Sequence, residues 1–176
     1  HCRDILNGLT REAGQQRAEG GGAVDALAWA RAVAERWQQL RPGAKLAMPA
    51  AATGPGAVIV ADASLGEALH NLIDNAANAN ARSGRQDAAV ELDVEAGAGA
   101  EAGMIVIAVG ERGPGFEPAR AEAARHAPLG AHAQGMGVGL MLAHAAIEHH
   151  GGRLEFRSRS GGGTIARMLI PEQVAR

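Results

Sequence analysis

The 176-residue sequence contains no tyrosine, and phenylalanine and tryptophan occur only twice each. Because aromatic side chains are so few, the core must be built from Leu, Ile, Val, Met and Ala. Cysteine is also scarce, since Cys2 is the single example, and this excludes an internal disulfide. A reducing compartment fits that count. The length is sufficient for one domain with a sizeable core and a short appendage.

The sequence also lacks long apolar runs and a strong charge of one sign. No apolar run approaches the length of a bilayer span, and no signal peptide is visible. The formal net charge of -2 provides no electrostatic attraction to nucleic acid or to an anionic membrane surface. We therefore expect no nucleic-acid partner.

Residues 64–82 carry the clearest pattern in the chain. Ser64 followed three residues later by Glu67 is a capping box, which predicts that a helix begins at Ser64. Apolar side chains then recur with helical spacing, so one face of this helix is expected to pack into the core. The residues of this apolar stripe are Leu65, Leu69, Leu72 and Ala76.

A second stripe on the same helix is rich in amides and consists of Asn71, Asn75, Asn78 and Arg82. The simple interpretation is an ordinary solvated face. Asn is a poor helix former, however, so three Asn residues on one line cost helix stability without an evident structural gain. An amide oxygen binds a hard cation such as Mg²⁺ without adding a formal charge, which suits a metal already held by phosphates.

The other segments predict two further helices and several strands. Helices are expected at 24–40 and 139–149, and strands at 45–48, 57–60, 89–94, 104–109, 153–157 and 164–170. These elements do not alternate as βαβ units. We therefore predict an α+β sandwich in which three helices cover one face of a mixed, mostly antiparallel sheet. Residues 116–134 lack apolar periodicity and are expected to form a long loop that acts as a lid.

Two glycine clusters flank this loop. Residues 110–116, Gly-Glu-Arg-Gly-Pro-Gly-Phe, follow a buried strand, and a tight turn with positive φ is the simple explanation. Residues 135–140, Gly-Met-Gly-Val-Gly-Leu, open a helix, where glycine lets backbone N–H groups approach a phosphate. The second cluster alone is not specific. It is neither a dinucleotide fingerprint, because no strand precedes it, nor a P-loop.

In combination, these motifs resemble the ATP-binding catalytic domain of sensor histidine kinases, whose superfamily includes gyrase, a heat-shock chaperone family and MutL. NLIDNA at 71–76 looks like the N box, ERGPGF at 111–116 like the first glycine box, and GMGVGL at 135–140 like the second. Residues 150–171 are similar to the closing part of that domain. The resemblance covers about residues 24–171 and implies the Bergerat fold, a two-layer α/β sandwich.

The resemblance also implies a division of the chain. Residues 1–18 would be the C-terminal remnant of a dimerisation helix, 19–23 a linker, 24–171 the ATP-binding kinase domain, and 172–176 a tail.

A narrower resemblance concerns redox control. CRDIL at 2–6, and HNLIDNA followed by ARS at 81–83, look like the redox-responsive RegB/PrrB group. In that group a cysteine at the matching position acts as a redox switch, which implies that Cys2 forms an intermolecular disulfide on oxidation. The alternative is a small apolar residue on the seam of a helix pair.

The resemblance implies catalytic roles for Asn71 and Asn75. Asn75 would coordinate the Mg²⁺ that bridges the nucleotide phosphates. Asn71 lies one turn earlier, where gyrase-type enzymes place a glutamate that activates water. An amide cannot take that proton, which suits a kinase that must not hydrolyse ATP. Asn78 replaces a basic residue that is common after the N box, so Arg82 or Arg85 is expected to supply the charge.

The two glycine boxes would hold the rest of the nucleotide. Glu111 matches the aspartate that accepts from the adenine amino group, and it is one methylene longer than the residue it replaces. The other ATP-binding residues implied by the resemblance are Gly113 and Gly115 at the base, Thr164 beside a water there, and Gly135, Gly137, Gly139 and Leu140 at the phosphates.

The resemblance thus implies a protein-histidine kinase domain that uses ATP and Mg²⁺. It would transfer the γ-phosphoryl group to a histidine of a dimerisation domain, with positioning and charge neutralisation as the catalytic work. His1 is not followed by the Glu and Pro of a kinase H box, so no self-phosphorylation is expected. The expected partners are the dimerisation domain of the same kinase and a response regulator. The full-length protein would be a homodimer anchored in the inner membrane, with this domain in the cytoplasm.

Two other functions stay open. One is a regulatory relative that binds nucleotide weakly, or not at all, and acts on a partner by contact; Glu111 and the altered loop favour it. The other is an ATP-hydrolysing conformational switch of the gyrase class, against which Asn71 argues.

Overall fold

The computed structural model describes residues 21–48, 56–113 and 137–174. Several sequence-based predictions lie outside these ranges and stay predictions. They concern Cys2, the segment 1–18, Gly115, Gly135 and the lid at 116–134.

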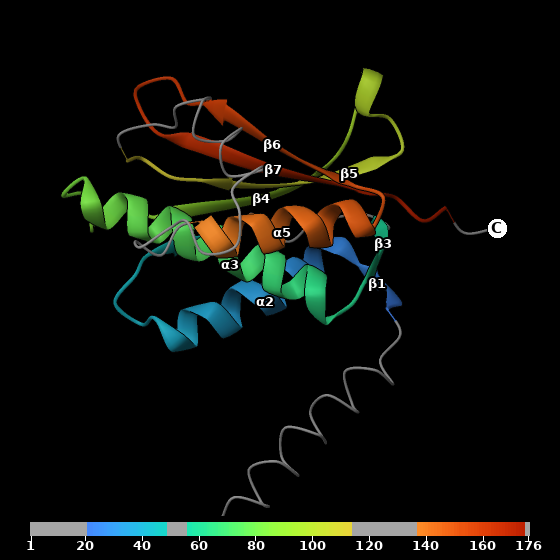
Figure 1. The fold of residues 1–176 in the computed structure, drawn as a ribbon, viewed down its shortest axis with the longest axis horizontal. Coiled ribbons are helices and arrows are strands. Elements are labelled where there is room, and N and C mark those ends of the chain that lie inside the picture. The colour runs from blue at the N-terminus through green and yellow to red at the C-terminus, as the bar shows by residue number, and fades with distance from the viewer. Residues whose placement is uncertain (1–20, 49–55, 114–136, 175–176) are drawn as a thin grey trace, which may run out of the picture.

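The described residues form two layers, with helices on one side of a five-stranded sheet (Figure 1). The helices are α2 (Ala26–Leu40), α3 (Ala63–Arg82) and α5 (Gly137–His149), together with the short 3-10 helix η1 (Gly99–Glu101). The strands are β1 (Gly22–Asp25), β2 (Leu46–Ala47), β3 (Val58–Ala61), β4 (Val90–Ala96), β5 (Met104–Gly110), β6 (Arg153–Ser158) and β7 (Thr164–Pro171).

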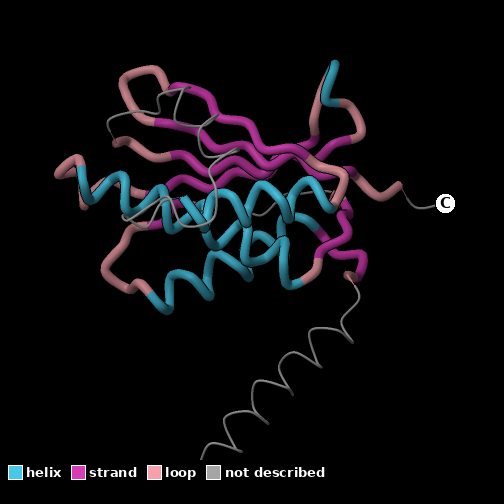
Figure 2. The backbone as a smooth tube through the Cα atoms, in the orientation of Figure 1, coloured by secondary structure: helices cyan, strands magenta, loops and turns pink. Residues whose placement is uncertain are grey.

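The sheet has the strand order β2-β4-β5-β7-β6. Its four longer strands pair antiparallel, and the short β2 adds to β4 in parallel. Strands β1 and β3 form a separate antiparallel pair at one end of the domain (Figure 2). The prediction of an α+β sandwich with a mixed, mostly antiparallel sheet is therefore confirmed.

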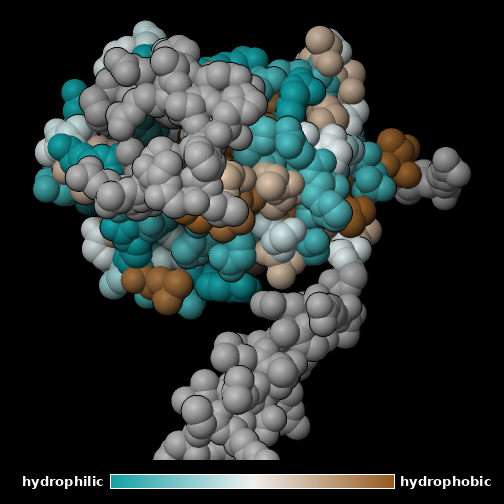
Figure 3. Space-filling model, in the orientation of Figure 1, coloured by the Kyte–Doolittle hydropathy of each residue, from teal (hydrophilic) through white to brown (hydrophobic). Residues whose placement is uncertain are grey.

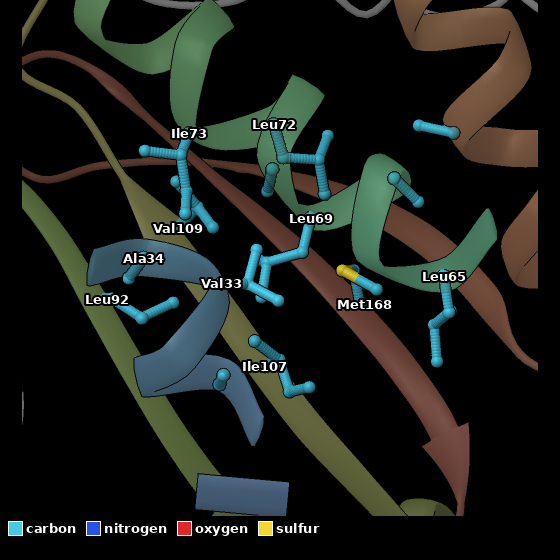
Figure 4. Close-up of a cluster of buried hydrophobic side chains, with 14 of the residues drawn as sticks. Val33, Ala34, Leu65, Leu69, Leu72, Ile73, Leu92, Ile107, Val109 and Met168 are labelled. Carbon is cyan, nitrogen blue, oxygen red and sulfur yellow. The ribbon is translucent and has the colours of Figure 1, made fainter. Parts of the chain in front are cut away.

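The apolar stripe of α3 lies at the centre of the core, as its spacing predicted. All four residues of the stripe are buried. Figure 4 shows Leu69 of α3 among side chains of α2 and of the sheet, including Val33, Ile107 and Met168. The burial of this face fixes the rotation of α3 about its axis. The amide-rich stripe lies on the adjacent face of α3, beside the core, where Asn71, Asn75 and Asn78 are half-buried.

The start of α3 differs from the prediction. Asp62, and not Ser64, is the N-cap residue, because Asp62 Oδ1 accepts a hydrogen bond from the Leu65 backbone N–H at 3.0 Å. The Ser64 hydroxyl donates to the same oxygen at 2.7 Å, and Glu67 is exposed. A carboxylate is a strong acceptor for the free N–H groups of a first turn, so the predicted capping box does not form.

The first helix begins later than predicted, at Ala26 instead of residue 24. The preceding residues pair with β3, with Val24 opposite Ile59, and this strand takes in two residues of the expected linker 19–23. Asp25 then caps α2 by accepting from the Ala28 N–H at 2.7 Å. A strand of four residues is too short to show a pattern in the sequence.

Where Figure 3 shows described residues, the surface is mostly polar, with small apolar patches. Among the residues that the structure describes, the large apolar side chains that are exposed are Leu40, Met48, Val138, Leu142 and Val174. Among the described residues, no helix is both long and apolar enough to cross a bilayer.

Candidate functional site

The amide face of α3 meets the start of α5 at Asn71. The Asn71 side-chain amide donates to the backbone carbonyl of Gly139 at 3.5 Å. A β-carbon added at Gly139 would lie 3.6 Å from the Asn71 carboxamide carbon, so glycine lets the two helices approach. Helix α5 begins at Gly137. The first N–H groups of a helix lack intrahelical partners and carry partial positive charge, which favours a phosphate at this point.

Asn75 lies one turn further along α3 and is half-buried. Its carboxamide makes no hydrogen bond to any residue that the structure describes. The described part of the chain also holds no group of three or more His, Cys, Asp or Glu that would bind a metal. A half-buried amide oxygen is a neutral ligand that suits a Mg²⁺ ion whose other ligands come from phosphate and water.

Asn78 is turned towards α2 and already has two polar partners. Its Oδ1 accepts from Arg41 Nη1 at 2.9 Å, and its Nδ2 donates to Asp74 Oδ2 at 3.2 Å. Arg41 Nη1 also lies 2.6 Å from Asp74 Oδ1. Arg82 and Arg85, the residues expected to supply a positive charge here, are exposed at and beyond the end of α3. The cation beside Asn78 is therefore Arg41, which no sequence pattern indicated.

The Asp74 carboxylate is held in its charged form. Burial alone would raise its pKa, but hydrogen bonds from Arg41 and from the Trp37 indole N–H at 3.2 Å outweigh burial, and the pKa is lowered. Arg41 and Asp74 thus form an ion pair at the edge of the amide face at neutral pH.

The turn after β5 forms the other end of the candidate site. Glu111 is 6% exposed, and its backbone N–H donates to the carbonyl of Thr164 at 2.9 Å. The Gly113 N–H donates to Glu111 Oε2. A β-carbon at Gly113 would lie 2.9 Å from the Ala79 carbonyl oxygen of α3, so only glycine fits there. The structure thus places Glu111 beside Thr164 and Gly113 against α3.

Asn80 is a member of this region that the sequence analysis missed. It is 1% exposed, its Oδ1 accepts from the Arg112 backbone N–H at 2.8 Å, and its Nδ2 donates to the Ala88 carbonyl at 3.2 Å. One buried amide therefore fixes both the glycine-rich turn and the loop after α3. A signal was present, because Asn80 lies four residues after Ala76, at the next position of the apolar stripe.

An ion-pair cluster supports the same turn from the sheet. Glu91 of β4 accepts from Arg159 at 2.6 Å and from Arg112 at 3.2 Å. The hydrogen bond from Arg159 is the main reason that the pKa of Glu91 is lowered, so the carboxylate stays charged. Arg159 also lies against Gly110, where an added β-carbon would be 3.0 Å from its Nη1.

Comparison with known proteins identifies the family. The family model described as "Histidine kinase-, DNA gyrase B-, and HSP90-like ATPase" matches residues 61–174. The chain belongs to this family. It is 36% identical over 107 residues to the C4-dicarboxylate transport sensor protein DctS of Rhodobacter capsulatus, a match that covers 60% of this chain and 15% of DctS. The chain therefore spans only a small part of that relative.

Two solved structures are similar in fold. The catalytic domain of histidine kinase ThkA is 18% identical, with a TM-score of 0.69, over 86% of this chain and 95% of that one. Full-length ShkA in complex with AMPPNP is 24% identical, with a TM-score of 0.66, over 89% of this chain and 32% of that one. These likenesses show the fold of this family of ATPase domains, the Bergerat fold.

Within this ATPase domain, the expected site residues fall into two groups. In the first group, Asn71 meets Gly139 where α3 contacts α5, with Asn75 one turn further along α3 and Gly137 at the start of α5. In the second group, Glu111, Gly113 and Thr164 lie at the turn after β5. Leu140, expected near the phosphates, is partly buried and packs against the core.

Proposed function

We propose that this domain binds Mg-ATP and passes the γ-phosphoryl group to a histidine of a dimerisation domain of the same kinase. The observation that carries the proposal is the contact of Asn71 with Gly139, which sets the amide face of α3 beside the first turn of α5. Phosphates would lie there, and the base would lie towards Glu111.

Each group of residues has a task in binding. The first backbone N–H groups of α5 would donate to phosphate oxygens. Asn75 would direct its amide oxygen at Mg²⁺, which supplies charge neutralisation between the phosphates when bound. Asn71 donates to Gly139 and, as an amide, accepts no proton from water. This set favours transfer over hydrolysis.

Glu111 would accept from the exocyclic amino group of adenine. Its Oε2 already accepts from the Gly113 N–H, whereas Oε1 makes no hydrogen bond among the described residues. The second oxygen is therefore available to a ligand. The added methylene of Glu, relative to Asp, would place this oxygen deeper towards the base.

The hydrogen bond from the Gly113 N–H to Glu111 favours a second candidate function. A carboxylate that accepts from its own turn is partly satisfied without ligand, and this supports a regulatory domain that binds nucleotide weakly and acts on a partner by contact. The partners of the kinase proposal are a dimerisation domain and a response regulator, in a homodimeric and membrane-anchored full-length protein. Control of that protein through Cys2 belongs to the same proposal.

Calorimetric titration with Mg-ATP separates these functions. The kinase proposal expects binding that requires Mg²⁺, together with transfer of labelled phosphate from ATP to an added dimerisation domain. Absence of binding at millimolar ATP would favour the regulatory function. Release of phosphate without an acceptor domain would instead favour the hydrolysing switch.

A further inference from the structure

Arg41, which caps the C-terminal end of α2, is held in a fixed position beside the amide face. Its backbone N–H donates to the carbonyls of Trp37 and Gln38 at 3.1 and 3.2 Å. Its own carbonyl accepts from the Gln38 side chain at 3.0 Å. The guanidinium carbon lies 5.9 Å from the centre of the buried Trp37 ring. Both the backbone and the side chain are therefore ordered before any ligand arrives.

Among the described residues, one nitrogen of the guanidinium makes hydrogen bonds to the protein. Arg41 Nη1 donates to Asp74 Oδ1 at 2.6 Å and to Asn78 Oδ1 at 2.9 Å. A guanidinium has five N–H donors, and those on Nε and Nη2 make no hydrogen bond among the described residues. The Arg41 side chain is 38% exposed. Three donors of a fixed cation therefore remain available to solvent or to a ligand.

The position of this cation completes the amide face. Asn71 contacts the start of α5 and Asn78 contacts Arg41, so the face runs from a positive helix end to a positive side chain. Seven residues of helix separate the two asparagines, about 10 Å along the axis. Asn75, whose amide makes no hydrogen bond among the described residues, lies between them. A chain of phosphates placed along this face would meet the start of α5 at one end and, at the other, the Arg41 guanidinium, whose Nη1 is paired with Asp74.

We propose that Arg41 is a phosphate-binding residue, and that its Nε and Nη2 donate to the phosphate chain of the nucleotide while Asp74 and Asn78 hold Nη1. Planar, two-point donation to phosphate is the contact for which arginine is best suited. The inference rests on the proposed function, because it needs nucleotide on the amide face. It assigns to α2 the positive charge that was expected from Arg82 or Arg85.

The test is calorimetric titration of Arg41→Gln with Mg-ATP and with adenosine. Loss of charge-assisted hydrogen bonds to phosphate should weaken Mg-ATP binding about tenfold or more. Adenosine, which has no phosphate, should bind as it does to the parent. Arg36→Ala is the matched control, since Arg36 is an exposed arginine of the same helix with no hydrogen bond or ion pair among the described residues. It should leave both affinities unchanged.

The variant Asp74→Asn distinguishes a purely structural role of Arg41 from direct contact with phosphate. If Arg41 served only to neutralise Asp74, then Asp74→Asn would restore the Mg-ATP affinity that Arg41→Gln loses, and the inference would be wrong. If Arg41 contacts phosphate, the double variant stays weak. Should Arg41→Gln fail to fold, Arg41→Lys takes its place, because it keeps the charge and loses the two-point contact.

The outcome for the parent domain keeps the two proposals apart. A parent that binds no Mg-ATP overturns the proposed function and the inference with it. A parent that binds Mg-ATP as tightly as Arg41→Gln or Arg41→Lys overturns the inference alone.

Discussion

The side-chain oxygen of Asn80 accepts a hydrogen bond at 2.8 Å from the backbone N–H of Arg112, so the last full turn of α3 holds the glycine-rich turn beside Glu111. The bond joins residues 32 positions apart in sequence, and Asn80 itself is buried. A position on the apolar side of α3 therefore orients the base end of the candidate site.

Asn80→Ala should destabilise the domain by about 1–3 kcal/mol, because it leaves the Arg112 N–H and the Ala88 carbonyl without their partner. The measurement is the free energy of unfolding in urea. Asn75→Ala serves as the control, since its amide has no protein partner among the described residues and should change stability by less than about 0.5 kcal/mol. Equal losses for the two variants would contradict the role given to Asn80.

Asn75→Ala should instead affect ligand binding. Removal of a Mg²⁺ ligand is expected to weaken Mg-ATP binding by roughly 1–3 kcal/mol, the scale for a lost partner of a charged group. Titrations with and without Mg²⁺ measure the effect, and the Mg²⁺ dependence should fall with it. Asn78→Ala, whose amide contacts Arg41 and Asp74, should keep the Mg²⁺ dependence of the parent. An unchanged dependence in Asn75→Ala would mean that another group binds the metal.

Glu111→Ala should reduce the preference for adenine. The carboxylate accepts from an amino group but repels the carbonyl oxygen that guanine has at the same place. Without it, ATP and GTP should bind more alike. Competition between the two nucleotides for the parent and for the variant gives the ratio. A ratio that is the same in both proteins would show that Glu111 does not read the base.

Asp62 makes the unfolding free energy of the domain depend on pH in the acidic range. Burial opposes its charge, but hydrogen bonds from the Leu65 N–H and the Ser64 hydroxyl, with the nearby His150, outweigh burial and lower its pKa. A carboxylate with a lowered folded pKa adds stability above its unfolded pKa, and that stability is lost as the pH falls through the folded value. Asp62→Ala should thus cost about 1 kcal/mol at neutral pH. The cost should shrink below about pH 4.

Glu67→Ala is the control that distinguishes the observed cap from the capping box of the sequence. Glu67 is exposed and takes no part in the cap, so its removal should change the unfolding free energy by less than about 0.5 kcal/mol at any pH. A loss comparable to that of Asp62→Ala would mean that the capping box forms in solution.

The elements that could be predicted from the sequence are those whose residues follow a periodic pattern or a recognisable motif. Both stripes of α3 follow from helical spacing, and one of them is the buried face. Strands were predicted at 153–157 and 164–170, where β6 and β7 lie, and Gly161 to Gly163 between them all adopt positive φ. The order of the glycine boxes indicated the family that the comparisons confirm.

The remaining features depend on contacts between distant residues. Strand β1 forms because Gly22–Asp25 pairs with β3. A segment of four residues is too short to show a periodic pattern in the sequence. Arg41 and Asp74 are 33 positions apart, and only the packing of α2 on α3 brings them within 2.6 Å. The sequence places Asn80 in an alanine-rich helix end, at the next position of the apolar stripe. Its buried hydrogen-bond partners are distant residues that only the fold brings near.

Because one helix carries the core on one face and the candidate site on an adjacent face, occupation of the site and melting of the domain are thermodynamically linked. A ligand held by α3 binds only the folded chain, so it must raise the melting temperature by an amount set by its concentration relative to its dissociation constant. The melting temperature therefore measures ligand binding at the site without any label. A nucleotide that binds and leaves the melting temperature unchanged would have to be held elsewhere, or equally well by the unfolded chain.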